Sequence, residues 1–93
     1  MRSKRELNDE IRRGQESSSF LNNPLFQQAV SDARDEVFHR WTNSESGDRE
    51  LREQLYHEWQ ALSVTLRGLQ KPITAGRLAA KQKDMRTYQE NLG

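Results

Sequence analysis

Two histidines, each four residues from a carboxylate, are the first candidates for chemistry in this chain. Asp35 precedes His39 and Glu53 precedes His57 at the spacing that brings two side chains together on one helix face. If the two segments run antiparallel, the pairs also fall opposite one another, as a metal site between subunits would require. At about 100° of rotation per residue, however, both pairs turn away from the apolar stripes described below. We therefore expect exposed acid–histidine contacts and no metal site.

No other pattern in the sequence suggests catalysis. The chain has no cysteine, which excludes thiolate zinc sites, disulfides and cysteine nucleophiles. No serine stands in a recognisable nucleophile motif, and Gly47 and Gly76 lie in no phosphate-binding loop. The carboxylates are mostly spaced for ion pairs with arginines on a solvated helix face, as Glu36 is with Arg40. We expect neither an enzyme nor a cofactor, and no small-molecule substrate.

Two apolar stripes predict the elements that position these groups. One begins after Asn23-Pro24, a strong helix start, and recurs every three or four residues as the face of a helix does. The other begins after a second capping residue, Asp48, and has the same steps in reverse order. The first stripe consists of Phe26, Val30, Ala33, Val37 and Trp41, and the second of Leu51, Leu55, Trp59, Leu62 and Leu66.

These stripes predict an antiparallel two-helix hairpin as the core of an all-α fold. Its helices are expected at Pro24 to about Asn43 and at Asp48 to about Gln70, within a hairpin segment 23–70. The reversed steps place the small Ala33 opposite the bulky Trp59, which predicts a close crossing of the two helices at that point.

Shorter helices are predicted on both sides of the hairpin. Segment 1–22 reads as a short N-terminal helix that ends near Gly14, followed by a mobile linker rich in serine. Segment 71–93 reads as a separate C-terminal helix with a basic tail. The reason is that Pro72 should break the preceding helix, and Thr74 has the chemistry to cap a new one.

The composition leaves room for only a thin core. Of the 93 residues, 32% are apolar and 31% are charged. Small helical chains of this kind commonly gain stability by pairing with copies of themselves or with a partner, so we expect a homo-oligomer or a bound state. No run approaches the roughly 18 apolar residues of a membrane span, and the charged start lacks a signal-peptide segment. We expect no membrane contact and a cytoplasmic location.

Charge is uneven along the chain. Residues 1–14 carry a net +2, residues 15–70 a net −4 and residues 71–93 a net +3. Most of this excess is expected to be solvated surface, and a non-specific contact of the basic ends with nucleic acid is the alternative. Arginine suits phosphate because its planar fork donates two hydrogen bonds at once. The candidates for such a contact are Arg2, Lys4, Arg5, Arg12, Arg13, Arg77, Lys81, Lys83 and Arg86.

Apolar side chains outside the stripes are the stronger functional candidates. Phe38 and Tyr56 each lie about 100° or less from the buried seam, and Leu25 adds apolar area that a two-helix interface does not cover. Met85 and Tyr88 belong to an apolar remnant of the last helix that is too short to be stable alone. The flanking helices, a second copy or a partner protein must cover such side chains. We predict all five as partner-binding residues.

Five short motifs between residues 23 and 79 carry a resemblance to a known group. They are Asn23-Pro24-Leu25-Phe26, Trp41-Thr42-Asn43, Asp48-Arg49-Glu50-Leu51-Arg52-Glu53, Ala61-Leu62 and Gly76-Arg77-Leu78-Ala79. Each motif is weak alone, but in combination they are distinctive. The segment resembles small, largely uncharacterised helical proteins of tailed bacteriophages. The resemblance implies a place among the products of genes for DNA packaging and the virion, and it carries over no catalytic residue.

Together these features predict a non-enzymatic phage accessory or virion-associated protein that acts through protein–protein contacts. It is expected as a homo-oligomer in the host cell cytoplasm, with possible incorporation into the virion. One alternative is an inhibitor of a host defence protein, because an acidic body can imitate nucleic acid. Another is a DNA-packaging factor that grips phosphate through the basic ends.

Overall fold

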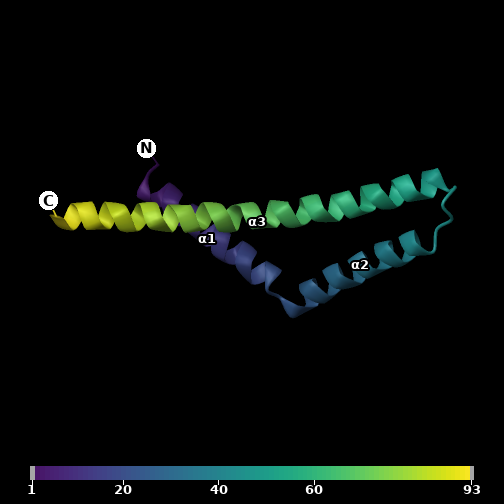
Figure 1. Cartoon of the computed structure of the whole chain (residues 1–93). Coiled ribbons are helices and arrows are strands. Elements are labelled where there is room, and N and C mark those ends of the chain that lie inside the picture. Colours follow the sequence, from purple (N-terminus) through teal and green to yellow (C-terminus); the bar gives the residue numbers. More distant parts are fainter. Residues whose placement is uncertain (1, 93) are drawn as a thin grey trace. The chain divides into compact units, whose positions relative to one another are not determined.

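The chain folds into three α-helices, and the computed structural model, which describes residues 2–92, contains no strand within that range. The helices are α1 (Lys4–Leu21), α2 (Pro24–Thr42) and α3 (Arg49–Leu92), as Figure 1 shows. They form two compact units: unit 1 contains α1 with α3 from Gly68 onward, and unit 2 spans Asn22–Arg67. The all-α prediction is confirmed. Within the described range, no helix has both the length and the apolar character needed to cross a membrane.

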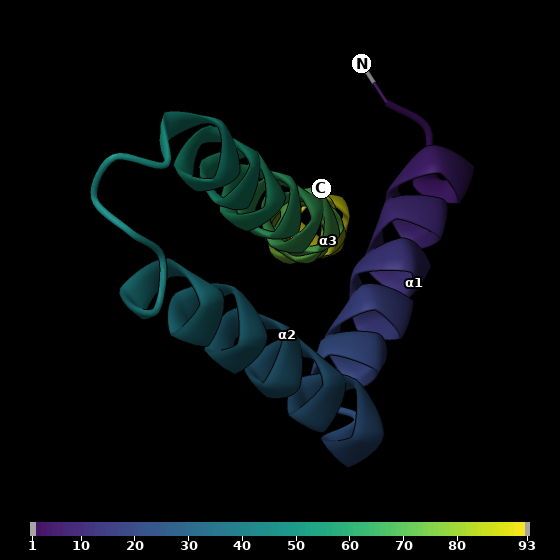
Figure 2. The same cartoon turned by 90° about the vertical axis from the view of Figure 1, so that its right-hand side faces the viewer.

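Unit 2 is the antiparallel hairpin that the stripes predict, with α2 and the first part of α3 joined by a turn at residues 43–48 (Figures 1 and 2). The side chain of Asn23 accepts hydrogen bonds from two backbone N–H groups in the first turn of α2, at 2.9 and 3.1 Å. Asp48 accepts one from the N–H of Leu51 at 3.1 Å. Both predicted caps are therefore confirmed, since each satisfies backbone donors that a helix start leaves unpaired.

The core of unit 2 is thin. Leu55 is 0% exposed, whereas most other stripe residues are half-buried and the two tryptophans, Trp41 and Trp59, keep 38% and 42% of their surface exposed. A salt bridge between Arg40 and Glu58, with 3.0 Å between Nη1 and Oε2, joins the two helices beside the stripes. The facing of Ala33 and Trp59 stays a prediction.

Unit 1 forms where α1 crosses the second half of α3 (Figures 1 and 2). A Cβ added to Gly14 would lie 2.8 Å from the backbone oxygen of Pro72 and 3.2 Å from the Cα of Gly76. Only glycine lets two helix backbones approach this closely without a clash. Leu7 and Ala79 flank the crossing and are 0% exposed. The small residues therefore create the crossing, and the two buried apolar side chains stabilise it.

The predicted mobile linker after Gly14 is wrong. α1 continues without interruption to Leu21, and Gly14 and Ser17 are both buried on its inner face. Their spacing of three residues is helical, but side chains this small give no hydrophobic signal in the sequence. Contact with the second half of α3 supplies the stability that the local sequence lacks.

The predicted helix break at Pro72, and with it the separate C-terminal helix, is also wrong. α3 continues past the proline, which costs one N–H donor and crowds the carbonyl four residues earlier. In this turn the Ser17 hydroxyl of α1 donates a hydrogen bond to the Leu69 carbonyl, so the neighbouring helix supports the weakened turn. Thr74 caps no helix, since its hydroxyl donates back to the Gln70 carbonyl at 3.4 Å inside α3.

The contact between Ser17 and the proline turn yields a stability prediction. Ser17→Ala should lower the free energy of unfolding by about 1 kcal/mol relative to Ser19→Ala, because only the former removes the hydrogen bond that joins α1 to the Leu69 carbonyl of α3. Ser19 is exposed in the same helix, so both variants gain the same helix propensity from alanine. Urea unfolding followed by circular dichroism measures the difference. Equal midpoints for the two variants would show that the hydrogen bond contributes nothing.

Candidate functional site

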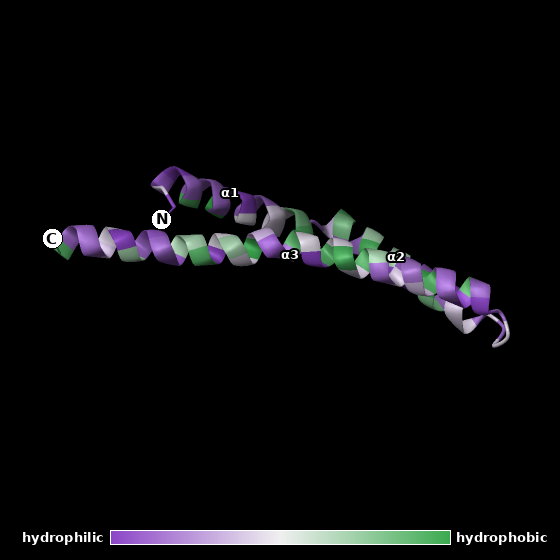
Figure 3. Cartoon of the chain, turned by 90° about the horizontal axis from the view of Figure 1, so that it is seen from above, coloured by the Kyte–Doolittle hydropathy of each residue, from purple (hydrophilic) through white to green (hydrophobic). Residues whose placement is uncertain are grey.

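The exposed aromatic side chains of unit 2 gather in one shallow groove along the hairpin. Val37, Phe38 and Trp41 of α2 line one side, and the other side is lined by residues of α3, which are Leu55, Tyr56 and Trp59. The groove encloses about 230 Å³ and is open to solvent. In Figure 3 the hydrophobic colour runs through α2 and the part of α3 beside it, whereas the start of α1 and the C-terminal part of α3 are mostly hydrophilic. We call this feature the aromatic groove.

The aromatic groove exposes side chains that normally avoid water. Phe38 is 64% exposed and Tyr56 is 52% exposed, while Leu55 beneath them is fully buried. A folded chain rarely leaves several neighbouring aromatic rings uncovered unless the patch meets another molecule. Aromatic residues are also the type that contributes most at protein–protein interfaces.

Polar groups frame the aromatic groove near the turn of the hairpin. The guanidinium carbon of Arg52 lies 5.2 Å from the ring centroid of Trp41, within the range of a cation–π contact. Its Nε also donates to the hydroxyl of Ser44 at 3.1 Å. These contacts fix Arg52 over one of the rings that line the groove.

The five predicted partner-binding residues are all exposed, but the structure brings only two of them together. Phe38 and Tyr56 share the aromatic groove. Leu25, at 80% exposure, does not line it, and Met85 and Tyr88, at 63% and 66%, belong to unit 1.

Two tryptophans also line the groove, although their periodicity predicts them in the buried stripes. They are Trp41 and Trp59. The overlooked signal is their size, because an indole at the edge of a two-helix seam is too large for the facing helix to cover.

The histidine–carboxylate pairs form no common site. Nε2 of His57 lies 3.8 Å from Oε1 of Glu53, and both side chains are largely exposed. The ring of His39 contacts the Asn43 amide at 3.0 Å, and no contact with Asp35 accompanies it. Across residues 2–92, no three His, Cys, Asp or Glu side chains are grouped so that they could hold a metal ion. The predicted exposed contact is confirmed for Glu53 and His57, whereas the predicted contact between Asp35 and His39 is wrong.

The predicted ion pair between Glu36 and Arg40 is wrong. Arg40 reaches across the hairpin to Glu58 instead. This cross-helix pair holds together α2 and α3, which a pair within one helix would not do.

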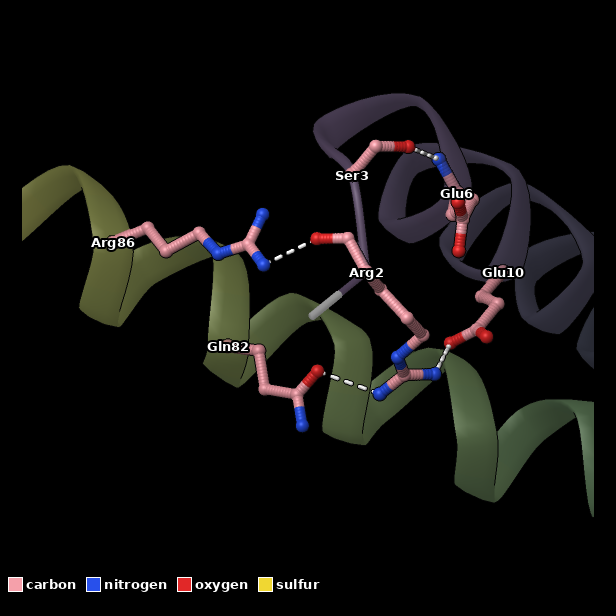
Figure 4. A network of polar contacts seen from close by, with 6 residues as sticks. All are labelled: Arg2, Ser3, Glu6, Glu10, Gln82 and Arg86. Carbon is pink, nitrogen blue, oxygen red and sulfur yellow. Dashed lines mark hydrogen bonds and ion pairs between the residues drawn. The ribbon is translucent and has the colours of Figure 1, made fainter.

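The predicted nucleic-acid-binding residues all lie in unit 1, because this unit combines both ends of the chain. Unit 1 carries ten Lys and Arg against six Asp and Glu, and unit 2 carries five against eight. The polar network in Figure 4 engages Arg2 with the Glu10 carboxylate and, at 2.6 Å, with the Gln82 side-chain oxygen. Arg86 donates to the backbone oxygen of Arg2.

Several of these cations form ion pairs or hydrogen bonds inside unit 1. Besides the network of Figure 4, Lys4 lies 3.6 Å from the Glu90 carboxylate, and Arg12 lies within 4 Å of Asp9 and Glu16. Within residues 2–92, the cations of the predicted set that form no ion pair or side-chain hydrogen bond are Arg5, Arg13, Arg77, Lys81 and Lys83.

Comparison with protein-family models, with curated proteins and with solved structures gave no match for this chain.

Proposed function

We propose that the chain is a non-enzymatic interaction protein that binds a partner protein through the aromatic groove of its hairpin. The observation that carries this proposal is the exposure of Phe38 and Tyr56 beside two tryptophans in one groove. Covering these rings removes apolar area from water and gains roughly 25 cal/mol per Å² before the costs of association. Because the core of the hairpin is thin, burial of apolar surface against a partner should stabilise it more than it would stabilise a well-packed domain.

The proposal extends to the setting in which the protein acts. The resemblance of residues 23–79 to proteins of tailed bacteriophages supports a phage accessory or virion-associated role, and it is the sole support for that part. Mass spectrometry of purified virions tests it. Presence of the chain in the particles is expected, and absence would contradict a role in the virion.

The groove itself is tested by capture of partners from infected cells with tagged protein. A variant with Phe38→Ser and Tyr56→Ser should lose the partner that the wild type captures, because both changes remove apolar contacts from the groove. Val64→Ser is the matched control, since Val64 is an apolar residue of unit 2 with 54% exposure that does not line the groove. Retained capture by the groove variant, or equal loss in the control, would contradict the proposal.

The identity of the captured protein distinguishes two roles. Capture of a virion protein supports a virion-associated or accessory role, whereas capture of a host defence protein supports the role of an inhibitor of that protein.

A second candidate function is a phosphate contact by unit 1. It is favoured by the concentration of both basic ends in that unit, including five cations without an ion-pair partner among the described residues. If this contact operates, affinity for duplex DNA should fall steeply between about 50 and 200 mM salt, because bound cations release counterions from phosphate. Substituting Lys81 and Lys83 by glutamine should make that salt dependence shallower. An unchanged slope would exclude these residues from the contact.

A further inference from the structure

The charges along the aromatic groove point to the chemistry of its occupant. We infer that the groove takes an amphipathic helix of a partner protein that carries two carboxylates about two turns apart, one on each side of its apolar residues. This inference rests on the proposed function, since it names the partner of the same groove.

Two arginines lie beside the aromatic groove, one on each of the two helices that line it. Arg34 precedes Phe38 by four residues in α2, and Arg52 precedes Tyr56 by four residues in α3, so each lies on the groove side of its helix. The contact of Arg52 with Trp41 places Arg52 at the turn end of the groove. Because Arg34 lies seven residues before Trp41, it is about 10 Å farther along the hairpin.

Both arginines are available to a carboxylate. Within residues 2–92, neither Arg34 nor Arg52 forms a salt bridge, whereas Arg40, outside the groove, pairs with Glu58. The next acids along the two helices, Asp35 and Glu53, are rotated by about 100° from the two arginines and flank the groove from outside. The groove therefore combines apolar rings with two nearby guanidinium groups that form no salt bridge among the described residues.

This combination matches one kind of occupant. A helix can fill about 230 Å³ with apolar side chains at positions i+3 and i+4, as helices docked in grooves do. Carboxylates at positions i and i+7 of that helix are about 10 Å apart along its axis and match the offset of the two arginines along the hairpin. Each would meet a guanidinium, which binds carboxylates through two parallel hydrogen bonds.

Other occupants are less compatible with these charges. A second copy of the chain, docked groove to groove, would bring the same arginines against each other, and like charges in an interface are unfavourable. Nucleic acid and anionic membranes carry extended negative charge, whereas unit 2 as a whole has eight acids against five bases. A short helix with two carboxylates would contact Arg34 and Arg52 without bringing extended negative charge against the acidic residues of unit 2.

The intrinsic fluorescence of the chain offers a direct test. Its only two tryptophans, Trp41 and Trp59, both line the groove, so any occupant should shift their emission. The probes are three synthetic helical peptides without tryptophan, each with leucines at i+3 and i+4. They carry Glu, Gln or Lys at both i and i+7.

The glutamate peptide should shift the tryptophan emission to shorter wavelength and bind about tenfold more tightly than the glutamine peptide. The lysine peptide should bind most weakly. In a variant with Arg34→Glu and Arg52→Glu the order of the glutamate and lysine peptides should reverse. If the double variant loses helicity, Arg34→Glu alone is used, because Arg34 is exposed. This single variant changes the charge beside the groove by half as much and should shift the peptide preference in the same direction.

The outcomes separate the inference from the function on which it rests. Equal affinity for all three peptides would overturn the acidic partner and leave the groove as a protein-binding site. An emission shift produced by phosphatidylglycerol vesicles or by raising the protein concentration, with no response to any peptide, would overturn both in favour of a membrane or a second copy.

Discussion

Replacing Gly14 by leucine should separate α1 from α3 and lower the free energy of unfolding of unit 1 by about 3 kcal/mol. Even a Cβ at this position would lie 2.8 Å from the backbone oxygen of Pro72. The neighbour is backbone and not the end of a flexible side chain, so the helices themselves would have to move apart. Hydrogen exchange of the α1 amides and thermal unfolding followed by circular dichroism measure the effect.

Gly68→Ala is the matched control for this prediction. Gly68 is also a helical glycine of α3, but nothing lies within 4 Å of an added Cβ. Alanine there should raise stability by roughly 0.5–1 kcal/mol, because it restricts the unfolded chain and favours helix. If Gly14→Leu unfolded at the same temperature as the wild type, the close crossing of α1 and α3 would not exist in solution.

Leu55→Ala should destabilise the hairpin by about 2–5 kcal/mol, the range for truncating a buried leucine. Leu55 is 0% exposed and lies beneath the rings of the aromatic groove. Its truncation therefore leaves a cavity in a core whose other apolar side chains are mostly half-buried. A loss of this size is a large fraction of the total free energy of unfolding of a small domain. The variant should therefore lose both cooperative unfolding and capture of the partner.

Leu25→Ala removes the same atoms from a side chain that is 80% exposed, and its effect should stay within about 0.5 kcal/mol. Urea unfolding of the two variants in parallel provides the comparison. Equal destabilisation would mean that Leu55 is not the centre of the hairpin core.

The hairpin was predictable because its signals are local. Asn23 and Asp48 mark the helix starts by side-chain chemistry that depends only on the next few residues, and the apolar stripes show which faces meet. Even the uncovered side chains Phe38 and Tyr56 follow from their angular position on a helix.

Unit 1 was not predictable in the same way, because its determinants lie far apart in the sequence. Gly14 resembles a helix end and Pro72 resembles a helix break when each is considered with its neighbours alone. Each becomes favourable only because the other helix is present: Gly14 lets α1 approach the proline turn, and Ser17 donates to the Leu69 carbonyl within it. Tertiary contact here overrides local preference.

The candidate site was predictable in part. Phe38 and Tyr56 were identified from the sequence, whereas Trp41 and Trp59 were assigned to the core, since periodicity indicates which way a residue points but not how much of it the facing helix covers. The role of Arg34 and Arg52 depends on their alignment with the groove, which requires the packed hairpin.

Site-specific photo-crosslinking tests the central claim most directly, that a partner protein occupies the aromatic groove. Benzoylphenylalanine is introduced at Tyr56 or, as a control, at Gln54, which is also exposed but about 160° around α3 from Tyr56. Illumination of infected cells should yield a covalent adduct of one defined protein from position 56 and none from position 54. Equal adducts from both positions, or adducts from position 54 alone, would contradict the account.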